Sequence, residues 1–205
     1  MVWMALLAGL AAQNDPAAAA RAEADGLIVA AGAGGVFENV TTDTVPTLRH
    51  MQSGLICHFT PGEATNSVTV YPEDDWLGHG DNVGCNTRGQ GMDVTVYATR
   101  YARQFPASVV AEDAAEAILH RWPGAQAYEG GFPLFTRPDR DDPPAHAVFQ
   151  VAIRNQPHVT FVLVQDEGEW SYKFRGTRAG EDVMAAGMTG SMMFMNALGG
   201  VGGEP

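Results

Sequence analysis

Positive charge is scarce in this chain of 205 residues, which has 24 acidic but only 12 basic side chains and a formal net charge of −12. Lys173 is the single lysine, and the arginines are spread along the sequence without forming a cluster. Phosphate backbones and anionic lipids are recognised by concentrated positive charge and are repelled by an acidic surface. We therefore expect no nucleic-acid partner and no attraction to an anionic membrane.

Cysteine is also rare, and Cys57 and Cys85 are the only two in the chain. Their spacing matches neither C-x-x-C nor a standard zinc motif, and no histidine is well placed to activate either thiol as a nucleophile. A minimal, even number of cysteines is typical of an exported domain with one cross-link. We predict a disulfide between Cys57 and Cys85. The alternatives are three zinc ligands, including His79, or two buried thiols in a cytoplasmic protein.

One continuous apolar run opens the chain, from Val2 to Ala12. Its length is that of the hydrophobic region of a signal peptide, and it is too short to span a bilayer. It lacks the basic residues that normally precede such a region. We interpret residues 1–12 as a signal-peptide remnant, which predicts a periplasmic or secreted protein. A cytoplasmic protein with an apolar first helix is the alternative.

Turn residues divide the next part of the chain into short elements. Asp15 followed by Pro16 is typical of a helix start and predicts an N-terminal helical segment at 13–34. Alternation predicts a half-buried strand from Met92 onwards, and apolar spacing predicts a helix near 107–122 with Ser108 as its N-cap. Turn signals separate four earlier short strands and an acidic loop, at 35–40, 47–51, 54–59, 67–71 and 72–84.

Three strong strands follow between 146 and 178, and the connecting turns are short enough for an antiparallel meander. A methionine-rich helix at 181–198 comes last, and no charged residue occurs from Val183 to Gly203. The glycines and polar residues of this stretch make it a poor membrane span. We therefore predict a single α+β domain at 35–198, in which helices, including this one, pack on an antiparallel sheet of about six to eight strands. Residues 199–205 are expected to form a flexible tail. The element order is similar to that of small exported domains of the PsbP/Mog1 kind, and this similarity of layout implies no function.

One sheet face is the place where positive charge and aromatic rings are predicted to come together on this acidic protein. The candidate ligand-binding residues there are Tyr97, Lys173, Arg175 and Arg178. Such a face suits a small anionic ligand. An ordinary solvated face with cross-strand pairs is the alternative.

Two groups of residues are weak candidates for metal ligands, although we expect neither a metal nor a cofactor. Methionines recur at every fourth position of the C-terminal helix, and thioethers favour copper(I), but methionine also fills gaps between a helix and a sheet. Three aspartates in the acidic loop suit Ca²⁺ by ligand type, but their spacing does not match a calcium-binding loop. The candidates are Met184, Met188, Met192, Asp74, Asp75 and Asp81.

No catalytic sequence motif is present. The chain has no G-x-S-x-G, H-E-x-x-H or G-x-G-x-x-G arrangement. His50, His120, His146 and His158 are scattered and expected at the surface or at strand ends. We predict a non-catalytic binding or interaction module, exported and stabilised by one disulfide, with an envelope protein or a small molecule as its partner. A hydrolase-like enzyme with residues from separate loops and an envelope metal-binding protein are the alternatives.

Overall fold

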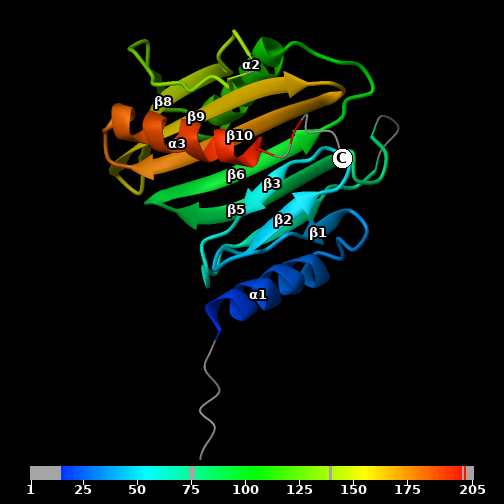
Figure 1. Ribbon diagram of the computed structural model, residues 1–205. Coiled ribbons are helices and arrows are strands. Elements are labelled where there is room, and N and C mark those ends of the chain that lie inside the picture. Colours follow the sequence, from blue (N-terminus) through cyan, green and yellow to red (C-terminus); the bar gives the residue numbers. More distant parts are fainter. Residues whose placement is uncertain (1–14, 74–76, 139, 200, 202–205) are drawn as a thin grey trace, which may run out of the picture.

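The computed structural model describes residues 15–73, 77–138, 140–199 and 201, and these form an α+β fold with two antiparallel sheets (Figure 1). The large sheet has seven strands in the order β4-β5-β6-β10-β9-β8-β7, and the small sheet has three in the order β1-β2-β3. The predicted fold class and strand number are confirmed. The small sheet is an addition, since a single sheet is predicted.

The helices are α1 (Pro16–Ala30), α2 (Ala107–Arg121) and α3 (Val183–Ala197). The small sheet consists of β1 (Phe37–Asn39), β2 (Thr47–His50) and β3 (Ile56–His58). The large sheet consists of β4 (Ser67–Val70), β5 (Asn82–Gly89), β6 (Met92–Thr99), β7 (Gln126–Ala127), β8 (Ala145–Ile153), β9 (Gln156–Glu167) and β10 (Trp170–Ala179).

Strand β10 defines the two faces of the large sheet, because successive side chains of a strand point to opposite sides. Tyr172 and Phe174 are almost completely buried, and we call their side the inner face. Lys173 and Arg175 point the other way, and we call their side the outer face. The predicted meander of β8, β9 and β10 is present.

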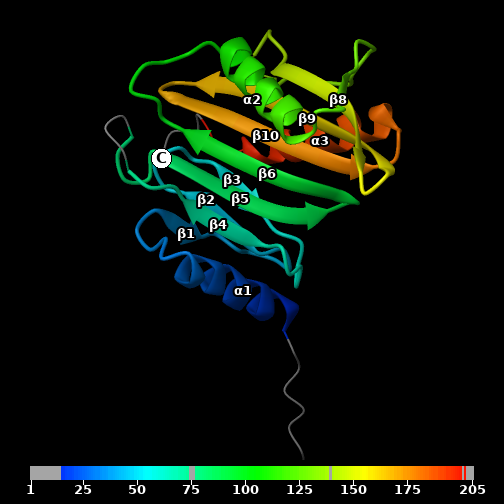
Figure 2. The same ribbon diagram turned by 180° about the vertical axis from the view of Figure 1, so that it is seen from behind.

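Different elements cover the two faces. Helix α3 and the small sheet lie on the inner face, in front of the large sheet in Figure 1, and enclose the main hydrophobic core. Helix α2 lies on the outer face, where it packs on β8 and β9 (Figure 2). Helix α1 packs beside β1 and β2, with Asp15 as its N-cap as predicted.

Helix α3 approaches the sheet closely because small residues line its inward side. A methyl group added at Gly190 would overlap the ring of Phe161, and one added at Gly187 would lie 2.5 Å from Pro133 Cδ. Asp182 caps the helix by accepting a hydrogen bond from the backbone N–H of Ala185 at 2.9 Å. Of the larger side chains of α3, Phe194 is completely buried beside Phe174, whereas Met184, Met188 and Met192 are exposed.

The structure differs from the predicted elements at β5, at the start of α2 and at β7, which is not predicted. Strand β5 is not among the predicted strands, because its glycines and asparagines are typical of turns, and residues 82–84 are assigned to the acidic loop. Ser108 is not the N-cap of α2; the helix already begins at Ala107, after Pro106.

Residues 1–12, predicted as a signal-peptide remnant, lie outside the described residues, as do 200 and 202–205 of the predicted tail. None of the helices in the described ranges has the length and hydrophobicity needed to cross a membrane.

Candidate functional site

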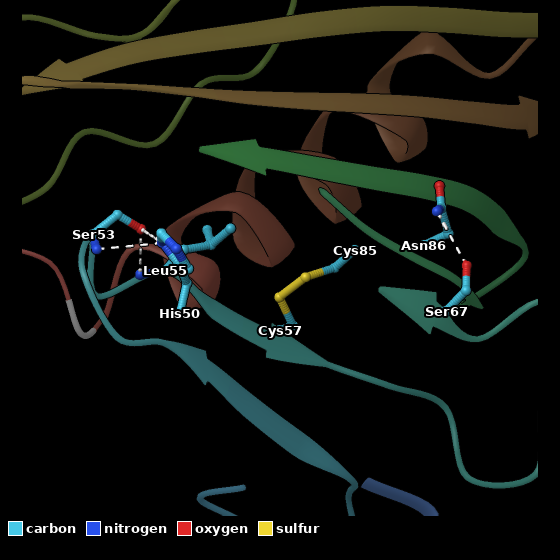
Figure 3. The surroundings of a disulfide bond; sticks show 7 residues. All are labelled: His50, Ser53, Leu55, Cys57, Ser67, Cys85 and Asn86. Carbon is cyan, nitrogen blue, oxygen red and sulfur yellow. Dashed lines mark hydrogen bonds between the residues drawn. A yellow bond between two sulfur atoms is a disulfide. The ribbon is translucent and has the colours of Figure 1, made fainter. Parts of the chain in front are cut away.

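A disulfide between Cys57 and Cys85 joins the two sheets. Cys57 lies in β3 of the small sheet, Cys85 lies in β5 of the large sheet, and their Cα atoms are 6.1 Å apart (Figure 3). Both side chains are buried, with exposed fractions of 2% and 4%. The predicted cross-link is present, so the two sulfurs are available neither to zinc nor as nucleophiles.

A cavity of about 670 Å³ lies beside this disulfide, between the small sheet, the inner face of the large sheet and the C-terminal end of α3. Its floor is almost entirely apolar, and it includes Phe59 of the chain after β3, Val94 and Val96 of β6, and Phe174 of β10. These floor side chains are buried. The described lining residues are Val45, Ile56, Cys57, His58, Phe59, Thr60, Pro61, Cys85, Thr87, Gly89, Gln90, Val94, Val96, Phe174, Met193, Met195, Asn196, Ala197 and Gly199.

The rim of this cavity is polar but uncharged. His58, Thr60, Gln90 and Asn196 are exposed residues of the lining, and no carboxylate, lysine or arginine is among the described lining residues. Desolvation lowers the pKa of His58, which favours its neutral form. The cavity can therefore enclose apolar groups at its floor and offer hydrogen bonds at its opening, without a charge to hold an ion.

A second, polar cavity of about 440 Å³ lies beside Asp81 and Arg100. Asp81 accepts hydrogen bonds from Arg100, at 2.8 Å from Nε and 2.6 Å from Nη2, and from the backbone N–H of Gly78 at 2.8 Å. Both carboxylate oxygens are thus engaged in holding the loop before β5. Because Asp81 is already bound to Arg100 within the protein, it is a poor candidate for the calcium ligand considered above.

His50 is the last residue of β2, one of the two kinds of position predicted for it, and its side chain is completely buried. Its Nδ1 lies 2.7 Å from Ser53 Oγ and accepts from the backbone N–H of Ser53 at 3.3 Å. Its ring packs between Phe37 and Trp170. Burial lowers the pKa of His50 to about 4. The side chain at the end of β2 turns inward because the small sheet folds over the large one.

The pair of Ser53 and His50 has the hydrogen bond of a serine nucleophile and its base, but not the surroundings. Ser53 Oγ also accepts the backbone N–H of Leu55 at 3.2 Å, and Ser53 is only 7% exposed (Figure 3). Neither residue lines the two cavities described above. Their arrangement stabilises the turn between β2 and β3.

The four predicted ligand-binding residues do not share one face. Lys173 and Arg175 lie on the outer face, and the Lys173 ammonium nitrogen is 4.8 Å from the centroid of the Tyr97 ring. Arg178 is an odd number of residues further along the strand from both, so it lies on the inner side, where its Nη1 donates to the carbonyl of Gln90 at 2.9 Å. The structure therefore brings together three of the four.

The three methionines at every fourth position of α3 face the solvent. The exposed fractions of Met184, Met188 and Met192 are 55%, 49% and 48%. They do not fill a gap between helix and sheet, because the glycines and alanines of α3 occupy that side. The structure describes neither Asp74 nor Asp75. No group of three or more His, Cys, Asp or Glu side chains in the described part of the chain is arranged to hold a metal ion.

Most residues of the apolar cavity are not predicted as site residues. They come from four segments that are distant in the sequence, and each occupies a position that looks like ordinary core in its own strand or helix. Only Met193 and Met195 could have pointed to this cavity from the sequence. They add large side chains at the end of a helix whose sheet-facing side is already occupied by other residues.

Comparison with known proteins does not place the chain in a family. No family model matches it, and no curated protein matches it. Among solved structures, it is similar to LpqN, a protein involved in cell envelope biogenesis of Mycobacterium tuberculosis, at 14% sequence identity and a TM-score of 0.29. The match covers 68% of this chain and 83% of that one. A similarity at this level says nothing about what the present chain binds.

Proposed function

We propose that this protein is an exported, non-catalytic binding module that holds a small, largely apolar molecule in the cavity beside the disulfide. The observation that carries the proposal is a cavity of about 670 Å³ with a floor of aliphatic, aromatic and sulfur-containing side chains. Ligand pockets in proteins typically measure roughly 300–1,000 Å³ and are mostly apolar with a few placed polar groups. The size and chemistry of this cavity match that description.

The lining favours an uncharged or amphipathic ligand. Burying an ion without a partner is costly, and the described lining offers neither a cation nor a carboxylate to pair with one. The side chains of Thr60, Gln90 and Asn196 at the opening can bind the polar end of a ligand whose apolar part lies on Phe59 and Phe174. An acyl chain or a small ring system with one polar end has the required shape.

Export is supported by the cross-link and by the apolar start of the sequence. Disulfides persist in oxidising compartments and are rare in the cytosol. The disulfide also forms one wall of the cavity, so the same compartment that oxidises Cys57 and Cys85 completes the site. The periplasm, or the exterior of the cell, is therefore the compartment in which we expect the protein to work.

A neutral fluorescent probe tests the proposal directly. We expect N-phenyl-1-naphthylamine to bind the purified protein saturably, with a strong rise in fluorescence as it enters the apolar cavity. Val96→Trp, which places an indole inside the cavity, is expected to weaken binding at least tenfold. The matched control is Val109→Trp on α2, because Val109 is a valine with 36% exposure on the other side of the sheet.

Thermal unfolding of both variants separates loss of the site from loss of the fold. The proposal requires that Val96→Trp keeps the cooperative transition of the wild type while losing the probe. Equal binding of the probe by the wild type and by folded Val96→Trp would show that the cavity is not the binding site.

A further inference from the structure

Half of the outer face of the large sheet has no cover in the described part of the chain. Helix α2 packs on β8 and β9, through Val110, Ala111 and Ala114 against Val162 and Val164. Figure 2 shows β6, β5 and β4 extending beyond this helix with nothing in front of them. The surface that remains includes the outward side chains of these three strands and of the neighbouring β10.

Two cations lie on this surface without an acidic partner. Lys173 and Arg175 are both half-buried, and no ion pair joins either of them to a carboxylate of the described residues. By contrast, Arg88 on the same face pairs with Asp93, and Arg100 pairs with Asp81. In a protein with twice as many acidic as basic residues, two adjacent unpaired cations on a sheet are unexpected for a purely structural role.

Two tyrosines lie next to these cations and add aromatic rings to the same face. The rings of Tyr71 and Tyr97 are stacked at an angle of 29°, with their centroids 6.3 Å apart. Gly84 of β5 lies beneath them: a Cβ atom there would be 3.3 Å from both Tyr71 Cε2 and Tyr97 Cδ1. The absence of a side chain at Gly84 lets both rings lie close to the sheet, since even a methyl group there would require the rings to shift slightly.

The positive charge of Lys173 is disfavoured by its surroundings, and no ion pair with a described carboxylate offsets this. Desolvation and the neighbouring charge of Arg175 lower the pKa of Lys173, and Asp113 of α2 acts in the opposite direction without forming an ion pair with it. Arg175 also acts electrostatically on Tyr71. An anion bound between the two cations would offset both the desolvation of Lys173 and its repulsion from Arg175.

We propose that this surface, which we call the tyrosine–cation face (Tyr71, Tyr97, Lys173 and Arg175), is a second binding site, for a small anionic ligand with a flat apolar part. A carboxylate or phosphate group binds between Lys173 and Arg175, where the guanidinium offers a planar, bidentate set of donors and the ammonium a compact charge. The flat part of the ligand packs on the exposed side of the tyrosine rings. This site is separate from the apolar cavity, which lies on the inner face of the same sheet.

The test measures the binding of phenyl phosphate by isothermal titration calorimetry at low ionic strength. We expect saturable binding with one ligand per chain, and at least tenfold weaker binding to Arg175→Gln and to Lys173→Met. The matched control is Arg178→Gln, because Arg178 is an arginine of the same strand that points to the opposite face. Its affinity is expected to stay within twofold of the wild type.

The contribution of the rings is measured by a second comparison. Tyr71→Leu is expected to weaken the binding of phenyl phosphate more than the binding of inorganic phosphate, because only phenyl phosphate has a ring that can stack on the tyrosines. The proposal is overturned if no saturable binding occurs, if Arg175→Gln binds as the wild type does, or if Arg178→Gln loses as much affinity as Arg175→Gln. The last result would mean that net charge alone attracts the anion.

Each of the two proposed sites can be tested without affecting the other. Val96→Trp is expected to retain phenyl phosphate binding, and Arg175→Gln is expected to retain the neutral naphthylamine probe, because the substituted side chains lie on opposite faces of the sheet. Simultaneous loss of both ligands in either variant would contradict the separation of the sites.

Discussion

The hydroxyl of Tyr172 donates a hydrogen bond of 2.6 Å to the backbone carbonyl of Ser53, which lies 119 positions earlier in the chain. Tyr172 lies in the middle of the large sheet, and Ser53 lies in the turn between β2 and β3 of the small sheet. Both residues are buried. Burial also raises the pKa of Tyr172, so its hydroxyl remains a neutral donor at physiological pH. Together with the disulfide, this bond holds the small sheet on the large one.

Removing this donor is expected to destabilise the protein. Tyr172→Phe keeps the ring but leaves the buried carbonyl of Ser53 without its partner, which costs about 1–3 kcal/mol. Urea denaturation measures the loss. Tyr128→Phe is the control, because Tyr128 is partly buried and its hydroxyl has no hydrogen bond to the described residues. If both substitutions cost the same, the bond to Ser53 is not what stabilises the contact between the sheets.

Removing the disulfide is expected to lower the free energy of unfolding by more than Tyr172→Phe does. A loop of this length contributes about 3.6 kcal/mol in the chain-entropy model of disulfides. We expect Cys57→Ala/Cys85→Ala to lose a free energy of unfolding of this order and to bind the naphthylamine probe less tightly, since one wall of the cavity is then held less firmly. A reducing agent should lower the stability of the wild type and leave the double variant unchanged. A cost below about 1 kcal/mol would contradict this account.

The buried histidine makes stability depend on pH in a defined window. The pKa of His50 is about 4 in the folded protein and 6.5 in the unfolded chain, so the unfolded state takes up a proton first as the pH falls. Its contribution is complete above pH 6.5 and is lost progressively towards pH 4, amounting to about 3 kcal/mol from the size of the shift.

Urea denaturation between pH 4 and 7 measures this contribution as the difference between the wild type and His50→Gln. The variant is expected to lose less stability on acidification, although it is less stable at pH 7. His120→Gln on the surface of α2 is the control and should follow the wild type. Parallel curves for wild type and His50→Gln would show that the imidazole does not titrate in this way.

The exposed methionines are expected to oxidise first. Solvent-accessible thioethers react readily with peroxide, whereas buried ones are protected. Met184, Met188 and Met192 should therefore become sulfoxides under mild hydrogen peroxide while Met92, which is completely buried, stays reduced. Peptide mass mapping measures each site, and the melting temperature should change little. Early oxidation of Met92 would mean that the inner core opens on the time scale of the reaction.

The close approach of α3 predicts opposite outcomes for two glycine-to-alanine changes in helices. Gly190→Ala inserts a methyl group into the ring of Phe161, and overpacking of this kind typically costs about 1–3 kcal/mol. Gly26→Ala in α1 meets nothing within 4 Å and should stabilise by about 0.5–1 kcal/mol through helix propensity. Thermal or urea unfolding measures both. A gain in stability for Gly190→Ala would show that α3 can move away from the sheet without cost.

Local signals in the sequence account for much of the fold. The cap at Asp15 and Pro16 marks the start of α1, and the short turns around Asn155 and Gly168 direct the three long strands into a meander. These elements are predictable because neighbouring residues decide them. Strand β5 is not, since its glycines favour turns locally and only pairing with β4 and β6 makes it a strand.

By itself, then, the sequence determined the α+β class, the meander, the cross-linked cysteines and the placement of Lys173 and Arg175 on one side of a strand. Only the tertiary structure decided that His50 is buried, that the methionines of α3 face the solvent and that Phe59, Val96 and Phe174 enclose a cavity. The reason is physical: caps, turns and strand alternation depend on interactions within a few residues, whereas burial and cavities depend on which distant surfaces meet.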